Sequence, residues 1–175
     1  MTSILAIDLQ RLAELLSYDP ETGIIRWKID MRGGRHHSSC KVRAGDEAGW
    51  MGALGYRWIW VDGKSRSAHR IAWALASGRW PEGALDHADG NRDNNCLSNL
   101  REASRSQNAA NSKRRRDNAS GFKGVHRHKG DLNWMARIQI NGKRLHLGSF
   151  ATAEEAHAAY CAAAARIFGE FARLE

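Results

Sequence analysis

The stretch that decides the fold is ALDHADGNRDNNCLSNLREASRSQN, residues 84–108. An apolar pair leads into an Asp-His dipeptide, and a loop rich in Asp, Asn and Gly follows before the short run NLREA. Ser104 stands three residues before Gln107, the spacing of a capping box, which predicts that a helix starts there. The order strand, loop, strand, helix is expected to bring His87 close to Asn108, although 21 residues separate them.

As a string of spaced residues, this stretch resembles the HNH nucleases, and in particular their free-standing, homing-type branch from phages and prophages. The resemblance reaches back through YDPETG, AGDEAG and AHRIAWALASGRWPEG and covers most of residues 17–111. It implies a β-β-α site around one divalent metal ion, with Asp86 and Asn108 as metal ligands and His87 as general base. Asn99 matches the middle Asn of the motif, which in this family holds the loop and the imidazole in place through hydrogen bonds.

The residue types suit the hydrolysis of a phosphodiester bond, which requires an activated water and stabilisation of negative charge on the phosphate and leaving oxygen. A neutral imidazole, whose ordinary pKa is about 6.5, can take a proton from water at cellular pH. Carboxylate and amide oxygens suit Mg²⁺ or Mn²⁺, which acts mainly as a Lewis acid toward the leaving oxygen. Neighbours on a strand point to opposite faces, so Asp86 and His87 serve one site only if the strand ends or twists there.

Other polar residues in the first half are interpreted as structural. Runs of Asp, Gly and Asn usually form ordinary turns, so the remaining loop residues are expected to shape the loop, with Asp89 as a possible support for the site. His69 also matches a family position and is expected to pack or hydrogen-bond. A metal cluster of His36, His37 and Cys40 is not predicted, because a fourth ligand is lacking. Most tryptophans are expected in the core, with base stacking as the alternative for some.

Composition indicates a folded protein with a polyanionic partner. Of the 175 residues 42% are apolar, and 27 Lys and Arg oppose 19 Asp and Glu, which gives a net charge of +8. The excess is uneven, since residues 1–108 carry 15 basic against 13 acidic side chains and residues 109–175 carry 12 against 6. The second half is therefore the better candidate for binding nucleic acid.

The cysteines and the N-terminus indicate a cytoplasmic setting, which would be the bacterial host cytoplasm for a phage-encoded protein. Three cysteines lie far apart without a C-x-x-C pair, which excludes an obvious zinc knuckle and a disulfide framework. The first residues predict an amphipathic helix over Ala6–Leu16 and not a signal peptide. No stretch is apolar enough to span a bilayer.

The chain is expected to form an α+β fold with two domains. Residues 1–111 form the nuclease domain, with an early strand in IIRWKI, a hairpin turning at Asp62-Gly63 and a ββα core at about 83–111. Residues 112–120 form a polar linker without hydrophobic periodicity. Its basic residues are expected to track DNA phosphates, and they are Lys113, Arg114, Arg115 and Arg116.

The last part, residues 121–175, predicts a three-stranded antiparallel sheet packed on one helix. In NWMARIQI, Trp134, Ala136, Ile138 and Ile140 share one face by alternation. A turn at Asn141-Gly142 leads into KRLHLGSF, and an Ala-rich helix is expected over residues 152–168. The open sheet face would present hydrogen-bond donors to base edges or phosphates, and these are His126, Arg137, Gln139, Arg144 and His146.

This part resembles the Apetala-two/ethylene-response-factor DNA-binding domain. It carries the pattern Gly-Val, Trp-x-Ala-x-Ile, Leu-Gly-x-Phe, Glu-Ala, Ala-Tyr and Ala-Ala, and the resemblance covers residues 121–174. It implies that the exposed sheet face lies in the major groove, and the five donors named above match the family's reading positions. Several arginines and the tryptophan of the plant domains are replaced, so target preference does not carry over.

We therefore expect a metal-dependent DNA endonuclease with one Mg²⁺ or Mn²⁺ per active site. DNA is the expected partner, without a membrane or another small-molecule cofactor, and a monomer is expected with a dimer as the alternative. The main alternative function is a non-catalytic, sequence-specific DNA-binding protein with a degenerate nuclease module. A nuclease that cleaves RNA is a third reading. The presence of Asp86, His87 and Asn108 together favours the enzyme.

Overall fold

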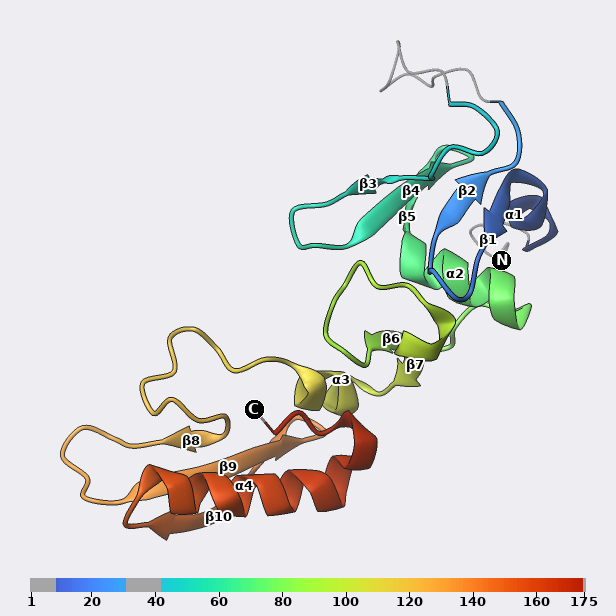
Figure 1. The fold of residues 1–175 in the computed structure, drawn as a ribbon. Helices are drawn as coiled ribbons and strands as arrows, with labels where there is room; N and C mark the ends of the chain where they lie inside the picture. The colour runs from blue at the N-terminus through green and yellow to red at the C-terminus, as the bar shows by residue number, and fades with distance from the viewer. Residues whose placement is uncertain (1–8, 31–41, 175) are drawn as a thin grey trace, which may run out of the picture. The chain divides into compact units, whose positions relative to one another are not determined.

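The computed structural model describes residues 9–30 and 42–174, and it confirms the α+β fold expected from the sequence (Figure 1). The chain divides into two compact units between Glu102 and Ala103, and each unit is described by itself. His36, His37 and Cys40 lie outside the described residues, as does the beginning of the N-terminal helix expected over Ala6–Leu16. No helix within the described ranges is long and apolar enough to cross a membrane.

The first unit opens with a helix and a two-stranded sheet. Helix α1 is described over Leu9–Leu15 and leads directly into β1 (Leu16–Tyr18), which pairs antiparallel with β2 (Ile25–Trp27). The YDPETG turn joins the strands, and the Asp19 side chain closes it by accepting from the Thr22 hydroxyl at 2.7 Å. The predicted turn is therefore fixed by its own side chains.

A second sheet follows in the order β3 (Trp50–Met51), β4 (Arg57–Val61), β5 (Lys64–Ser67), and helix α2 (Ala68–Ser77) comes directly after it. The hairpin turns at Asp62-Gly63 as predicted. Both residues have positive φ, 45° and 79°, which is the conformation that a two-residue hairpin turn requires. The largest fully buried side chains of this unit form one core, and they are Leu12, Leu15, Leu16, Ile25, Ile59, Val61 and Ile71.

The expected burial of most tryptophans holds for only half of the six in this unit. Trp27 is buried, and Trp73 and Trp80 pack against the core. In contrast, Trp50, Trp58 and Trp60 are 42%, 36% and 44% exposed. The alternation of β4 explains the exposure of Trp58 and Trp60, because its fully buried residues Ile59 and Val61 occupy the core face. Trp50 lies opposite Trp58 on the neighbouring strand β3.

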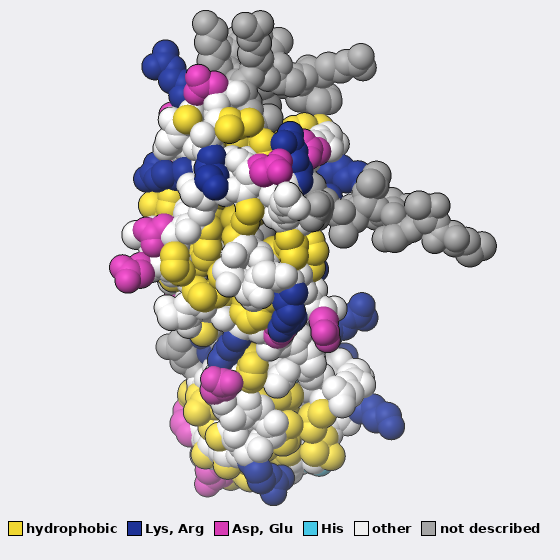
Figure 2. Space-filling view, turned by 90° about the vertical axis from the view of Figure 1, so that its right-hand side faces the viewer, with side chains coloured by type: hydrophobic (Ala, Val, Ile, Leu, Met, Phe, Trp, Pro, Cys, Tyr) yellow, Lys and Arg dark blue, Asp and Glu magenta, His cyan; other side chains and the backbone are white. Residues whose placement is uncertain are grey.

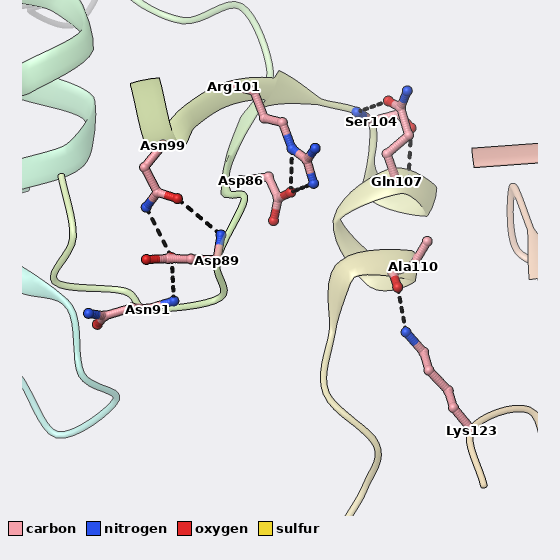
Figure 3. A network of polar contacts seen from close by, with 9 residues as sticks. All are labelled: Asp86, Asp89, Asn91, Asn99, Arg101, Ser104, Gln107, Ala110 and Lys123. Atoms are coloured by element: carbon pink, nitrogen blue, oxygen red, sulfur yellow. Dashed lines mark hydrogen bonds and ion pairs between the residues drawn. The ribbon is translucent and has the colours of Figure 1, made fainter. Parts of the chain in front are cut away.

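The predicted strand, loop and strand of residues 84–103 are present. Strand β6 (Ala84–His87) and strand β7 (Leu100–Ala103) form a two-stranded sheet, and the short 3-10 helix η1 (Leu97–Asn99) ends the loop between them. The predicted capping box begins helix α3 (Arg105–Asn111). Ser104 Oγ accepts from Gln107 N at 3.2 Å, and Gln107 Oε1 accepts from Ser104 N at 2.8 Å (Figure 3).

The second unit contains the predicted three-stranded antiparallel sheet. Its order is β10 (Lys143–Phe150), β9 (Trp134–Ile140), β8 (Val125–His126), and helix α4 (Ala153–Phe168) lies across one face, followed by the short helix η2 (Gly169–Phe171) (Figure 1). Asn141 and Gly142 have φ of 48° and 80°, so the predicted turn is confirmed. The buried contacts join Ala136 and Ile138 of the sheet to small and aromatic residues of α4.

The boundary between the units lies before α3, whereas the sequence places the junction in the basic stretch 112–120. Helix α3 packs into the second unit, where Ala103 and Ala110 join the cluster of Ile138 and the α4 residues. Lys123 Nζ donates to the carbonyl oxygens of Ala110 (Figure 3) and, at 2.7 Å, of Ser112. The stretch after α3 is therefore tied to the same unit as the helix.

Candidate active site and nucleic-acid interface

Asp86 and His87 lie at the end of β6, and each is only 4% exposed. Asp86 Oδ2 accepts from Arg101 of β7, from Nε at 3.0 Å and from Nη2 at 2.8 Å (Figure 3). A buried carboxylate needs such a partner, because a buried charge without one is costly. The strand ends at His87, which is the condition under which both side chains can serve one site.

His87 is held from the loop by Asn95, which is 2% exposed. The His87 Nε2 atom lies 3.2 Å from Asn95 Oδ1. An amide oxygen only accepts hydrogen bonds, so a hydrogen bond at this contact requires the proton on Nε2. The contact therefore favours the tautomer of the neutral ring that has its lone pair on Nδ1.

Asn99 fixes the loop between β6 and β7 from its centre. Its Oδ1 accepts from Asp89 N at 3.0 Å, and its Nδ2 donates to Asp89 Oδ1 at 3.0 Å (Figure 3). The same Nδ2 also donates to Asn94 O at 2.8 Å. Burial alone would raise the pKa of Asp89, but the hydrogen bonds from Asn94, Asn91 and Asn99 hold that pKa below its usual value. The side chain that holds the loop is therefore that of Asn99, and the amide that contacts the imidazole of His87 is that of Asn95.

Asn95 and Arg101 were not singled out by the sequence analysis. The backbone around Asn95 is positioned by the distant YDPETG turn, where Tyr18 donates its hydroxyl to Asn95 O at 2.8 Å. A Cβ at Gly23 would lie 2.6 Å from the Asn95 carbonyl carbon, so only glycine allows this approach. The position of Asn95 therefore depends on contacts with a distant turn, and the sequence carries no local signal for them.

Asn108 belongs to the second unit, where it lies on α3 and its backbone N donates to Ser104 O at 3.0 Å. The first unit brings together Asp86, His87 and Asn99, and the role of Asn108 as a metal ligand stays a prediction. Over residues 9–30 and 42–174, no group of three or more His, Cys, Asp or Glu side chains could hold a metal ion. The side-chain oxygens of Asp86 and Asn108 suit a hard cation that is bound by few protein ligands and by water, and they do not suit structural zinc.

The five residues predicted to read DNA all lie on strands of the sheet in the second unit. His146 lies opposite Arg137 and Arg144 lies opposite Gln139 in the register of β10 and β9. Partial burial lowers the pKa of His126, and the positive groups of Arg137 and its neighbours lower it further. The charged groups of this face are therefore close enough to repel one another, as expected for a surface that binds a polyanion.

The basic stretch after α3 lines a groove beside this sheet. The groove has a volume of about 560 Å³, and its lining includes Lys113, Arg114, Arg115, Arg137 and Arg144, with Asp117 as its acidic side chain. Arg116 is exposed and is not part of the lining. By contrast, the face drawn in Figure 2 mixes Lys and Arg with Asp and Glu.

Comparison with known proteins finds two family matches in different parts of the chain. A family model described as HNH endonuclease matches residues 66–110, and one described as AP2 domain matches residues 120–170. The chain is 37% identical over 82 residues to Protein 3.8 of Escherichia phage T7, an alignment that covers 46% of this chain and 68% of that protein. It is 33% identical over 124 residues to an uncharacterized HNH endonuclease, L560, of Acanthamoeba polyphaga mimivirus, which covers 70% of this chain and 64% of that protein. On these matches the chain belongs to the HNH endonuclease family and carries an AP2 DNA-binding domain in its second half.

Proposed function

We propose that this protein is a DNA endonuclease of the homing type that hydrolyses phosphodiester bonds and requires Mg²⁺ or Mn²⁺. The observation that carries the proposal is the arrangement of His87. Its imidazole is buried beside Asp86 at the end of β6, and the contact with Asn95 Oδ1 leaves the lone pair on Nδ1. A neutral imidazole held in one tautomer is what a general base for water requires.

In this mechanism Nδ1 of His87 takes a proton from the attacking water. The water oxygen forms a bond to phosphorus while the bond from phosphorus to the leaving oxygen breaks. The imidazole becomes a cation as the proton arrives, and the Nε2–H donation to Asn95 Oδ1 becomes charge-assisted and therefore stronger. Asn95 thus favours the protonated ring that forms during the reaction.

Asp86 and Asn108 would hold the divalent metal ion through their side-chain oxygens. A carboxylate has about four lone-pair directions, so the two donations from Arg101 to Oδ2 are compatible with a further ligand role for Asp86. When bound, the metal supplies Lewis-acid stabilisation of negative charge on the leaving oxygen. Asn99 and Asp89 keep the loop in the shape that places Asn95 on the imidazole.

The AP2 domain would bind the target DNA through the outer face of its sheet. The side chains proposed to enter the major groove are His126, Arg137, Gln139, Arg144 and His146. The basic stretch Lys113, Arg114, Arg115 and Arg116 would contact phosphates beside it and make the affinity sensitive to salt. One active site per chain predicts that a monomer nicks one strand.

The decisive experiment incubates supercoiled plasmid with the protein and Mg²⁺ or Mn²⁺, with EDTA as control, and compares wild type with His87→Ala. We expect nicking by the wild type, none with EDTA, and a loss of about 10²-fold or more in the variant, since general-base catalysis contributes about 10²–10⁴-fold. DNA binding without metal should be equal for both proteins. Equal cutting by both would remove His87 as the base, and binding without cutting would establish the non-catalytic alternative. A matched RNA substrate tests the third reading.

A further inference from the structure

Three aromatic rings from separate elements meet at the end of β6. Tyr56 precedes β4, His69 is the second residue of α2, and His87 closes β6. The ring centroids of His69 and His87 are 5.2 Å apart, those of Tyr56 and His69 5.3 Å, and those of Tyr56 and His87 6.1 Å. The planes of the two imidazoles differ by 75°, which is an edge-to-face contact.

Each neighbouring ring is anchored to the elements that carry His87. Arg70, next to His69, donates to Pro81 O at 3.1 Å and to Gly83 O at 2.9 Å, which ties α2 to the segment before β6. The Arg92 guanidinium lies 4.8 Å from the centre of the Tyr56 ring and donates to Leu54 O at 2.8 Å. The loop after β6 is thereby tied to the hairpin that carries Tyr56.

The contact with Asn95 fixes only one atom of the His87 ring. A ring held at Nε2 and at its Cβ can still tilt about the line through those two points, which swings Nδ1 away from a fixed direction. Contacts with two further rings restrict that tilt, because buried side chains in close packing have little room to move. Contacts with His69 and Tyr56 therefore both limit the tilt of the His87 ring.

We propose that His69 is a positioning residue for His87, which together with Tyr56 holds the imidazole plane so that Nδ1 faces the attacking water. The inference rests on the proposed function, since it gives His69 a purpose in that reaction. Burial, followed by the proximity of His87 and Arg70, lowers the pKa of His69 to about 4. His69 is therefore uncharged at neutral pH and does not repel the imidazolium that forms on His87.

The test compares His69→Ala, which removes the ring, with His69→Phe, which keeps an aromatic ring and removes the nitrogens. Single-turnover cleavage of a defined duplex at varied protein concentration separates the rate constant from the affinity. For His69→Ala we expect a fall in rate of about 10²-fold, since small misplacements of reacting groups cost about that much. Apparent affinity should change little, and His69→Phe should recover most of the rate. Ser77→Ala, at the opposite end of α2, controls for general loosening of that helix.

Nitrogen-15 NMR of the His87 ring gives a readout that does not depend on cleavage. Wild type should show one tautomer with the proton on Nε2. His69→Ala should keep that proton, because Asn95 still accepts from it, but should shift and broaden the Nδ1 signal as the ring tilts, while circular dichroism still reports a folded protein. An unchanged His87 signal in His69→Ala would overturn the inference, whether or not the enzyme cuts DNA. Equal losses of rate in His69→Phe and His69→Ala would also overturn it, because the nitrogens would then act directly. A changed signal in a protein that never cuts would uphold the positioning role and refute the proposed function.

Discussion

Replacing Asn95 with alanine removes the acceptor that selects the tautomer of His87. Asn95 is 2% exposed and its Oδ1 lies 3.2 Å from His87 Nε2, so the variant leaves a buried N–H without this partner. Such a loss costs about 1–3 kcal/mol of the free energy of unfolding. For a unit of about 100 residues each kcal/mol lowers Tm by about 4–8 °C, so a fall of several degrees is expected.

The effect on the reaction follows from the charge that forms on the ring. A hydrogen bond to a charged group contributes about 1.5–3 kcal/mol, and this contribution disappears when the imidazolium of the transition state lacks Asn95. With a tenfold change in rate for each 1.36 kcal/mol, single-turnover cleavage should slow by about 10- to 150-fold. Nitrogen-15 NMR of His87 should show that the selection of one tautomer is lost.

Asn94→Ala is the matched control, because the Asn94 side chain donates to Asp89 Oδ2 at 2.7 Å and not to the imidazole. It should lower Tm while the rate of cleavage at a temperature well below Tm changes much less. Our reasoning would be refuted if Asn95→Ala cut DNA at the wild-type rate, or if the two variants lost the same amount of rate.

Three further predictions concern other parts of the chain. Gly124→Ala should unfold the AP2 domain at a markedly lower temperature in a calorimetric scan, because φ is +76° and the new Cβ would lie 2.1 Å from the Tyr160 ring. Asp89→Asn should make the free energy of unfolding fall less steeply in acid. The pKa of Asp89 is lowered in the folded protein, so its carboxylate stabilises the fold above the usual carboxyl pKa, and this stabilisation is lost as pH falls through the folded pKa. Denaturant titrations at several pH values measure the difference. Arg115→Ala should weaken binding to all DNA sequences and reduce the slope of log K against log salt by about 0.9, whereas Gln139→Ala should change the preference among sequences in a binding-site selection.

The hairpin turns and the start of helix α3 could be predicted from the sequence, because each is caused by residues that are neighbours along the chain. The turns at Asp62-Gly63 and Asn141-Gly142 follow from the two positive φ angles that such hairpins need. The capping box at Ser104 follows from bonds within four residues. These features depend on neighbours along the chain, so they can be read without knowledge of the tertiary structure.

Features that depend on tertiary packing could not be read in this way. Alternation in RWIWV groups Trp58 with Trp60 but does not say which face the rest of the unit covers. Asn95 stands among several loop amides of the same type, and it becomes the partner of His87 through the fold of the loop against Tyr18 and Gly23. Residues 18 and 95 are far apart in the sequence, and a single sequence carries no mark of their contact.

One side of helix α3 anchors it to the second unit, and the opposite side carries Asn108. The helix has seven residues, and a helix of that length is not stable in water without packing, so it needs an apolar partner. Ser106 and Ala110 are four residues apart and therefore share one side of the helix, and Ala103 precedes the helix at the end of β7. The alanines join the buried cluster of the second unit, and Ser106 Oγ accepts from Asn141 N at 2.7 Å. Asn108 is two positions from both Ser106 and Ala110, about 200° around the helix, and so lies on the opposite side, where anchoring the helix leaves its amide out of the packed face.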